Sequence, residues 1–384
     1  MDDLVALRRT LHATAEVGLH LPATQAIVRD AIAGLGLDTT LGQELSSVTA
    51  VLRGARPGPV VLLRADMDAL PIAEATGLPY ASTNGAMHAC GHDMHMAGLV
   101  GAARILGARR DELPGTVVFM FQPGEEGYAG GRLMIEEGVL DAAGRRPVAA
   151  YAIHVDCVLG AGEFVTRAGP IMASASGLNI RVEGTGGHAA YPYQAVDPVP
   201  VAAEIVLALQ TFVTRRVPVT DPAVVSVVRL HSDSNAPNVL PSSVAIDLNI
   251  RTLSRETLRL VREELGRLVA GLAAAHGCTA RTEFIDSYPV THNDPAETAA
   301  VLDLLGDRVR QLPAPAMASE DFGYVLEEVP GALLFLGARP AGVPAADAPP
   351  MHSERAAFDD AVLSIQAQTL AELAWRRLAQ ETAT

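Results

Sequence analysis

Nine residues, MHACGHDMH at positions 87–95, hold three histidines, one cysteine and one aspartate. Cys90 and His92 are two residues apart, so a thiolate and an imidazole could bind one metal ion together or bridge a pair of ions. A catalytic metal site needs at least three such donors and one open position for water. The segment therefore predicts part of a metal site, whose remaining ligands come from elsewhere in the chain.

Further candidate ligands follow at wide spacing. Glu125 and Glu126 are adjacent, so their side chains diverge, and one can bind metal while the other acts as general base toward water. His154 follows a strongly apolar segment, and His352 precedes a stretch rich in acidic residues. Together with the cysteine and histidine above, these donors are sufficient for two ions that share a ligand.

Two other interpretations compete with a dinuclear site. A cysteine beside histidines is also the arrangement of a cysteine hydrolase, with Cys90 as the nucleophile. A non-catalytic module that binds acyl amino acids would use the same cleft without turnover. Taken singly, each histidine or glutamate is more often structural than functional. The metal interpretation gains its weight from the set as a whole, and Glu125 would be dispensable for binding alone.

The elements that must position these residues are short apolar runs alternating with helical patterns. Such an alternation predicts an α/β domain with a mostly parallel sheet covered by helices. Ligands bind beyond the carboxyl ends of the strands in such sheets, and three of the runs lead there into acids or a histidine. The predicted strands are residues 60–68, 116–127, 148–156 and 332–338, and a predicted helix covers 95–112.

Residues 175–286 have a different rhythm. Alternating strands near 176–184, 223–230, 243–253 and 278–286 are interleaved with helices at 197–216 and around 258–272. The order β-α-β-β-α-β is the ferredoxin-like arrangement. We therefore expect an inserted lid or dimerisation domain at 175–286, within a metal-binding catalytic domain formed by residues 1–174 and 287–384.

Composition excludes several classes of function. The net charge of −15 disfavours nucleic-acid binding. The chain has no lysine, which excludes a Schiff-base lysine, a pyridoxal phosphate lysine and a Walker A lysine. No apolar run is long enough to span a membrane, and the start, MDDLVALRRT, is not typical of a signal peptide. Three widely spaced cysteines favour a reducing cytoplasm.

Eight motifs together resemble a known family. In order they are RADMDALP, MHACGHDMH, FQPGEEG, AIHVD, GGHAAYPYQAVDP, PNVLP, MASEDF and MHSERAAFDD. The chain is similar over essentially its whole length to the dinuclear metal amidohydrolases, a family of aminoacylases, carboxypeptidases and dipeptidases. The Cys-Gly-His-Asp element resembles the branch of hippurate hydrolases, N-acyl-amino-acid amidohydrolases and auxin–amino-acid conjugate hydrolases.

The resemblance implies roles for the residues above. It implies that Glu125 is the general base and later the proton donor to the leaving amine. It also implies two divalent ions, with zinc most expected and manganese or cobalt as alternatives. The implied metal ligands are Cys90, His92, Glu126, His154 and His352.

Other residues match the family's positions for binding and support. Asp66 and Asp68 match an acidic motif and are expected to support the ligands rather than bind metal. His188 is expected to reach the partner subunit's active site in a homodimer formed through the lid, and Asn238 to contact substrate. Arg251 lies on the polar face of its predicted strand and is expected to bind the carboxylate of a small N-acyl amino acid.

Two departures from the family pattern concern specificity. Tyr193 stands where a histidine is usual, and Met94 stands where this branch usually has glycine. Neither residue is an implied ligand. We expect both to bear on the shape of the substrate pocket.

Overall fold

The computed structural model describes residues 2–381, and the chain divides into two compact units. Unit 1 is formed by Met1–Ile171, His292–Ala314 and Asp321–Thr384. Unit 2 is formed by Met172–Thr291 together with the short segment Pro315–Glu320. The chain thus leaves the first unit, builds the second, and returns.

In the part of the chain that the structure describes, unit 1 contains an eight-stranded sheet in the order β1-β2-β4-β3-β5-β16-β6-β15. Its central strands β4, β3, β5 and β16 are parallel, and antiparallel pairs extend it toward both edges. The strands are β1 Asp38–Leu41, β2 Val48–Arg53, β3 Val60–Asp66, β4 Thr116–Gln122, β5 Ala149–Asp156, β6 Phe164–Thr166, β15 Val309–Gln311 and β16 Gly331–Gly337. The predicted parallel sheet is confirmed.

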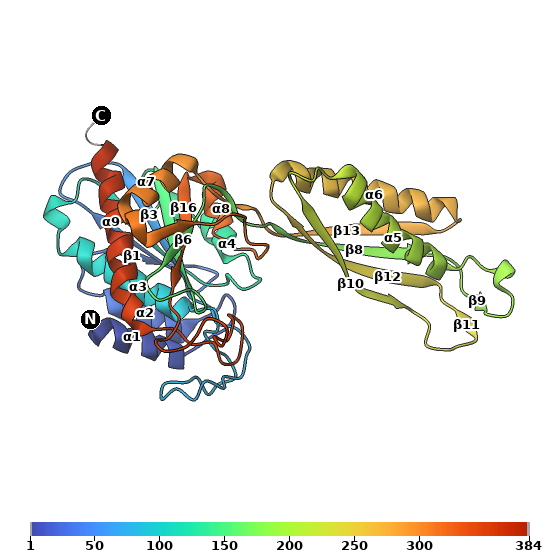
Figure 1. Ribbon diagram of the computed structural model, residues 1–384, viewed down its shortest axis with the longest axis horizontal. Helices are drawn as coiled ribbons and strands as arrows, with labels where there is room; N and C mark the ends of the chain where they lie inside the picture. Colours follow the sequence, from blue (N-terminus) through green and yellow to red (C-terminus); the bar gives the residue numbers. More distant parts are fainter. Residues whose placement is uncertain (1, 382–384) are drawn as a thin grey trace. The chain divides into compact units, whose positions relative to one another are not determined.

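Helices cover this sheet. Figure 1 shows α3 and α9 side by side, where they pack against β3 and β5, while α4 packs against β4 and α8. Every residue of β3 and of β16 is buried, as expected for strands covered on both faces. The helices are α1 Asp2–Ala13, α2 Pro22–Ile32, α3 His92–Gly107, α4 Gly130–Glu136, α7 Pro295–Leu305, α8 Gly323–Glu328 and α9 Leu363–Glu381, with 3-10 turns η1 Arg110–Glu112, η2 Val139–Asp141, η4 Gly306–Arg308 and η5 Asp360–Val362.

Unit 2 is a four-stranded antiparallel sheet in the order β10-β12-β8-β13. Both of its long helices lie on one side of the sheet (Figure 1), where the apolar side chains of β12 alternate into the core. The elements are β8 Ala175–Glu183, α5 Pro198–Arg216, β10 Ala223–Ser232, β12 Ser243–Thr252, α6 Arg255–Ala275 and β13 Thr279–Tyr288, with short pieces β9 Gly187–His188, η3 Pro192–Gln194 and β11 Val239–Leu240. Two further short strands, β7 Gly169–Met172 and β14 Thr291–Asn293, pair with each other and contain the points of the chain where unit 2 begins and ends.

Local sequence explains where the helices of unit 2 begin. The Asp197 carboxylate accepts a hydrogen bond from the Val199 backbone N–H at 2.9 Å, and a proline occupies the first helical position of α5. The Ser254 hydroxyl caps α6 by accepting from the Thr257 N–H at 3.0 Å. Among the described residues, no helix is both long and apolar enough to cross a membrane.

Candidate metal centre

Four segments that are far apart in the sequence bring candidate ligands together in unit 1. Cys90 lies just before α3, and its Sγ is 3.5 Å from Nε2 of His154, near the carboxyl end of β5. His352 Nε2 lies 3.3 Å from the same sulfur and 3.3 Å from Oε1 of Glu126, which follows β4. The cluster therefore lies beyond the carboxyl ends of parallel strands, where the sequence predicted it.

His92 is the first residue of α3 and is fully buried. Its Nδ1 lies 2.8 Å from the backbone carbonyl of Asp68 and donates a hydrogen bond to it. The other ring nitrogen, Nε2, has no hydrogen-bond partner among residues 2–381. A buried nitrogen whose opposite N–H is fixed by a carbonyl is the usual state of an imidazole that binds metal. The side chain thus fits a metal ligand.

The possible ligand atoms fall into two groups with one shared member. In one group, atoms of Cys90, His92 and His154 all lie within 4.8 Å of one another. In the other, the same holds for Cys90, Glu126 and His352. The donor set of one thiolate, three imidazoles and one carboxylate suits zinc or a similar transition metal. The residues therefore fit two ions, and Cys90 is the residue that both groups contain.

Glu125 and Glu126 are held in place through their backbone. Their N–H groups donate to the two carboxylate oxygens of Asp68 at 2.9 and 3.0 Å, so one aspartate fixes the turn that carries both glutamates. The Glu125 side chain is buried, and a carboxylate oxygen lies within 4.8 Å of ligand atoms of His92 and Glu126. It is therefore close enough to the cluster to act on a water there.

Asp66, at the end of β3, belongs to a buried charge network. Its Oδ2 accepts from the Arg64 guanidinium at 2.7 Å, and Arg64 also donates to Asp321 at 2.8 Å. Burial alone would raise the pKa of the Asp66 carboxyl, but Arg64 and the neighbouring histidines hold this pKa well below its usual range. The carboxylate is therefore ionised, and it adds negative charge 3.6 Å from Nε2 of His92.

The cluster's charges act on the protonation of its members. Burial, followed by the nearby Glu126 and Glu125 carboxylates, raises the pKa of the Cys90 thiol well above its ordinary value. Burial disfavours the charged form of His92, but Asp66 and Asp68 outweigh it and raise its pKa to about 10. The carboxylates near Cys90 and His92 contribute to both shifts, and their negative charge favours a cation at this place. A divalent cation would take the place of these protons.

Two histidines of the 87–95 segment were left without a role by the sequence. His95 is buried and joins Asp66 to the backbone of β5. His88 is also buried, neither of its ring nitrogens has a hydrogen-bond partner in the described chain, and burial lowers its pKa to about 3. Neighbouring Met94 is fully buried in the core of unit 1.

The three predicted substrate-binding residues all lie in unit 2. His188, on β9, is exposed, and the Asn238 carbonyl accepts from the Ala189 N–H at 3.0 Å, so these two positions are neighbours. Arg251 Nε donates to Asn249 at 3.0 Å, while its buried Nη1 has no hydrogen-bond partner among the described residues. The structure describes no contact that joins this arginine to His188.

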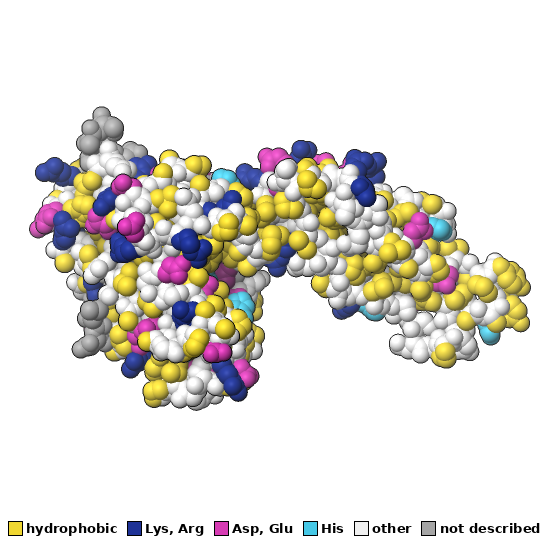
Figure 2. Space-filling model, in the orientation of Figure 1, with side chains coloured by type: hydrophobic (Ala, Val, Ile, Leu, Met, Phe, Trp, Pro, Cys, Tyr) yellow, Lys and Arg dark blue, Asp and Glu magenta, His cyan; other side chains and the backbone are white. Residues whose placement is uncertain are grey.

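Apolar side chains gather at the tip of unit 2 around the loop that follows β9 (Figure 2). Tyr193 is 79% exposed there and Tyr191 is 50% exposed. The Tyr193 ring does not pack into the core of unit 2, so it is available for contact with another molecule.

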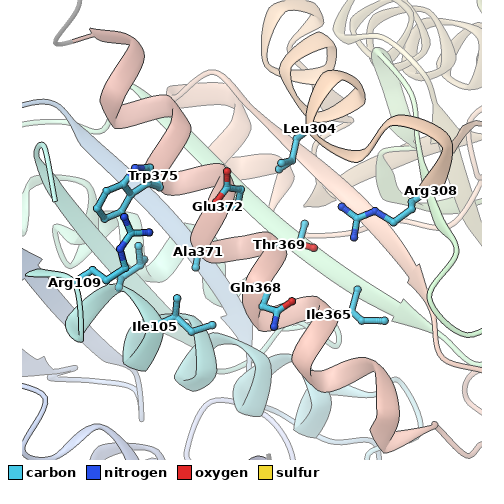
Figure 3. Close-up of a pocket in the computed structure, with 11 residues that line it drawn as sticks. Ile105, Arg109, Leu304, Arg308, Ile365, Gln368, Thr369, Ala371, Glu372 and Trp375 are labelled. Carbon is cyan, nitrogen blue, oxygen red and sulfur yellow. The ribbon is translucent and has the colours of Figure 1, made fainter. Parts of the chain in front are cut away.

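Two cavities lie apart from the cluster. A cavity of about 360 Å³ in unit 1 lies between the carboxyl ends of α3 and α7 and the side of α9, with Arg109 against Trp375, its guanidinium carbon 3.9 Å from the ring centroid (Figure 3). A groove of about 620 Å³ in unit 2 runs between α5 and α6. Neither is lined by a predicted site residue.

Comparison with known proteins extends the resemblance. A family model described as Peptidase family M20/M25/M40 matches residues 62–376. The chain is 36% identical over 337 residues to N-acetyl-L-cysteine deacetylase of Bacillus subtilis, and this match covers 87% of this chain and 80% of that protein. It is 35% identical over 344 residues to N-acetyldiaminopimelate deacetylase of Listeria monocytogenes, covering 88% and 91%.

A solved structure gives the same result. A dinuclear metal binding peptidase of the M20 family from Bacillus subtilis superimposes with a TM-score of 0.85 and 31% sequence identity, and the match covers 98% of each chain. The similarity thus extends through both units.

Proposed function

We propose, from the premise that this chain belongs to Peptidase family M20/M25/M40, that it hydrolyses the amide bond of N-acyl or aryl-acyl amino acids or of dipeptide-like conjugates. Membership makes the chain a metal-dependent hydrolase of amide bonds. The observation that carries the rest is that His92, whose Nε2 has no hydrogen-bond partner in the described chain, shares one close group of possible ligand atoms with Cys90 and His154 and another with Glu125 and Glu126.

The proposed ligands are Cys90, His92, Glu126, His154 and His352. Two divalent ions bound there would supply a Lewis acid and lower the pKa of a water molecule. We propose zinc, because a thiolate and imidazoles form its preferred ligand set, with manganese or cobalt as the alternatives. Asp68 orients two of these ligands without binding metal itself. Its backbone carbonyl accepts a hydrogen bond from the His92 ring, and its carboxylate accepts one from the Glu126 backbone N–H.

Glu125 is the proposed general base. Its carboxylate takes a proton from the attacking water and afterwards delivers that proton to the leaving nitrogen of the amide. Its place beside the ligands, and its backbone bond to Asp68, support this role. Adjacent Glu126 is the ligand, so the two glutamates divide the work of binding metal and moving the proton.

Substrate recognition is assigned to three residues of unit 2. Arg251 offers a buried guanidinium nitrogen, Nη1, that has no hydrogen-bond partner within residues 2–381, which suits a substrate carboxylate. His188 is proposed to donate a hydrogen bond to the oxygen of the scissile carbonyl as negative charge develops on it. Asn238, its neighbour, is proposed to contact the substrate amide. Exposed Tyr193 lies in the 3-10 turn η3, shortly after His188 in the sequence, and is proposed to influence which substrates bind.

We also propose that residues 175–286 form a ferredoxin-like lid and dimerisation domain, inserted between 1–174 and 287–384. Its β-α-β-β-α-β order and the strand order β10-β12-β8-β13 support this assignment. β10 is an edge strand that exposes Val228 (64%) and Leu230 (52%), so it offers backbone and apolar groups to a second copy.

The three cysteines are free, which suits the cytoplasm.

The cysteine-hydrolase alternative is favoured by two contacts of the Cys90 sulfur, 3.5 Å to Nε2 of His154 and 3.3 Å to Nε2 of His352. Its nucleophile must be a thiolate, however, and burial and the Glu126 and Glu125 carboxylates raise the pKa of this thiol. The non-catalytic alternative leaves the buried Glu125 without a function.

Metal content and turnover decide among the three. Elemental mass spectrometry of the purified protein should find about two ions per chain. The protein should hydrolyse members of a panel of small N-acyl amino acids, and this activity should be lost when a chelator removes the metal. Glu125→Gln should keep its metal and lose about 100-fold or more in turnover. Full activity after complete metal removal would establish Cys90 as nucleophile, and metal without turnover on any amide would favour a binding module.

A further inference from the structure

The parallel strands β3 and β5 separate at their carboxyl ends. β3 remains paired with β4 as far as Asp66 opposite Gln122, but its pairing with β5 stops at Arg64 opposite Ala152. Beyond that point β5 continues beside β16 to Asp156. A gap therefore opens between β3 and β5 just where the candidate ligands lie, and backbone groups of β5 on that side need another partner.

The imidazole of His95 fills this gap. Its Nε2 accepts a hydrogen bond from the Val155 backbone N–H at 2.8 Å, and its Nδ1 lies 2.5 Å from the Asp66 carboxylate. Because Nε2 accepts, it carries no proton, so the proton is on Nδ1 and is donated to Asp66. The ring is therefore neutral, with one tautomer, and it connects the ends of two separated strands.

The same ring also contacts two proposed ligands. It stacks on His92 with ring centroids 5.4 Å apart and 29° between the planes. It meets the ring of His154 edge to face, at 4.7 Å and 67°. The Val155 carbonyl accepts a hydrogen bond from Nδ1 of His154 at 2.7 Å and so orients that ligand. His95 in turn fixes Val155, because it accepts from the Val155 N–H.

His95 is not itself a ligand. Asp66, His92 and His95 place possible ligand atoms within 4.8 Å of one another, but both nitrogens of His95 are used in hydrogen bonds. In addition, the Arg64 guanidinium lies 2.7 Å from Asp66, so a further cation there would face a fixed positive charge.

We infer that His95 is a positioning residue of the metal centre: a neutral imidazole spacer that joins Asp66 to Val155 and thereby fixes the directions of His92 and His154. The inference rests on the proposed function, because it takes these two histidines as metal ligands. Residues that orient ligands in this way change metal affinity by about 10- to 100-fold when they are removed.

Three substitutions separate the two hydrogen bonds. His95→Gln can place an amide oxygen near Nε2 and accept from Val155, whereas His95→Asn can place an amide N–H near Nδ1 and donate to Asp66. His95→Ala loses both bonds. The matched control is Tyr151→Phe, which removes a buried hydrogen bond to Glu297 from the same strand, β5, without touching the cluster.

The measurement is cobalt(II) binding by the metal-stripped full-length protein, followed through the absorption bands of the bound ion. His95→Ala should bind cobalt about 10- to 100-fold more weakly and with an altered spectrum. The Gln and Asn variants should lose less affinity, and Tyr151→Phe should keep the wild-type spectrum even if its melting temperature falls.

Two results would overturn the inference. One is wild-type affinity and spectrum in the Ala variant. The other is a loss of affinity in the Ala variant that is fully explained by the fraction of its molecules that are unfolded, with the spectrum of the bound ion unchanged. That result would show that His95 acts on stability alone. If the wild-type protein bound no cobalt at the cluster, the proposed function itself would fail, which is a separate outcome.

Discussion

His352 Nε2 lies 3.3 Å from Cys90 Sγ, although the two residues are 262 positions apart. The His352 backbone is in the left-handed region, with φ of +66°, which is uncommon for a residue other than glycine. Its N–H donates to the Ala89 carbonyl at 3.0 Å, so the strained turn is tied to the residue before Cys90. Such strain is typical of functional sites.

This geometry makes different predictions for individual ligands. Cys90 belongs to both ligand groups, whereas His352 belongs to one and His154 to the other. Cys90→Ala should therefore weaken both ions, and the metal content should fall from about two per chain toward zero. His352→Ala and His154→Ala should each retain about one ion. Elemental mass spectrometry after gel filtration measures this, and two tightly held ions in Cys90→Ala would contradict a shared sulfur.

Gly91 sets the entry into α3, and its replacement should disturb the site. It has φ of +85°, and an added Cβ would lie 2.4 Å from Val155 Cγ2 and 3.0 Å from the Phe358 ring. Gly91→Ala combines left-handed strain, about 1–2 kcal/mol, with overpacking of about 1–3 kcal/mol. We expect a lower free energy of unfolding in urea and weaker metal binding.

Gly85 supplies the control for that substitution. Its φ is +87°, nearly the same as that of Gly91, but an added Cβ would have nothing within 4 Å. Gly85→Ala should show the conformational strain without the clash, and so lose only about 1–2 kcal/mol while keeping its metal. Equal losses in the two variants would mean that the contacts with Val155 and Phe358 relax freely.

The buried strands were predictable because their apolar runs need no tertiary information. β3, β4, β5 and β16 each match a predicted strand, and the carboxyl ends of β4 and β5 deliver the proposed ligands Glu126 and His154. β1 and β2 were missed: β1 is exposed throughout and has no apolar pattern. The start of α3 was placed three residues late, because a left-handed glycine rather than a polar side chain precedes the helix.

The side-chain partners were harder to predict than the strands. The role of His95 depends on the separation of β3 from β5, which no local pattern encodes. The two hydrogen bonds that the Asp68 carboxylate accepts from the Glu125 and Glu126 backbone likewise depend on strands that are distant in the sequence. Met94, which we expect to bear on the shape of the substrate pocket, is fully buried in a part of α3 where every residue from His92 to Ala103 is buried. Residue types identified the chemistry, and the tertiary fold identified the supports.

His12 should make the stability of unit 1 depend on pH. It is buried, its Nδ1 lies 2.8 Å from Asp93, and its Nε2 lies 3.1 Å from Glu74, with Arg8, Tyr80 and His88 also nearby. Burial lowers the pKa of His12, but Asp93 outweighs it and the net shift is upward. A raised pKa in the folded state stabilises the fold below about pH 6.5, the unfolded value, and this stabilisation is lost as the pH rises through the folded pKa.

His12→Asn tests this, because an amide can still donate to Asp93 but carries no charge. In chelator, so that metal binding does not contribute, the wild type should exceed the variant by about 1.5–3 kcal/mol in free energy of unfolding at about pH 5.5. The difference should shrink at a pH above the folded pKa of His12. His276→Asn, on an exposed pair with Glu204, should change by less than about 1 kcal/mol at either pH. If the difference in free energy of unfolding between the wild type and His12→Asn grew as the pH rose, the pKa of His12 would be lowered in the folded state and not raised.

Metal removal should destabilise the chain in a concentration-dependent way. The ligands come from the segment that enters α3, from the turn after β4, from β5 and from the loop before α9, and an unfolded chain does not hold these separate segments together. Ions that bind only the folded state add about 2.7 kcal/mol for each site when the free metal is 100 times its dissociation constant. Calorimetry should therefore show a melting temperature that falls on chelation and rises with added zinc. A melting temperature that is indifferent to zinc, with activity intact, would leave the cluster without a metal role.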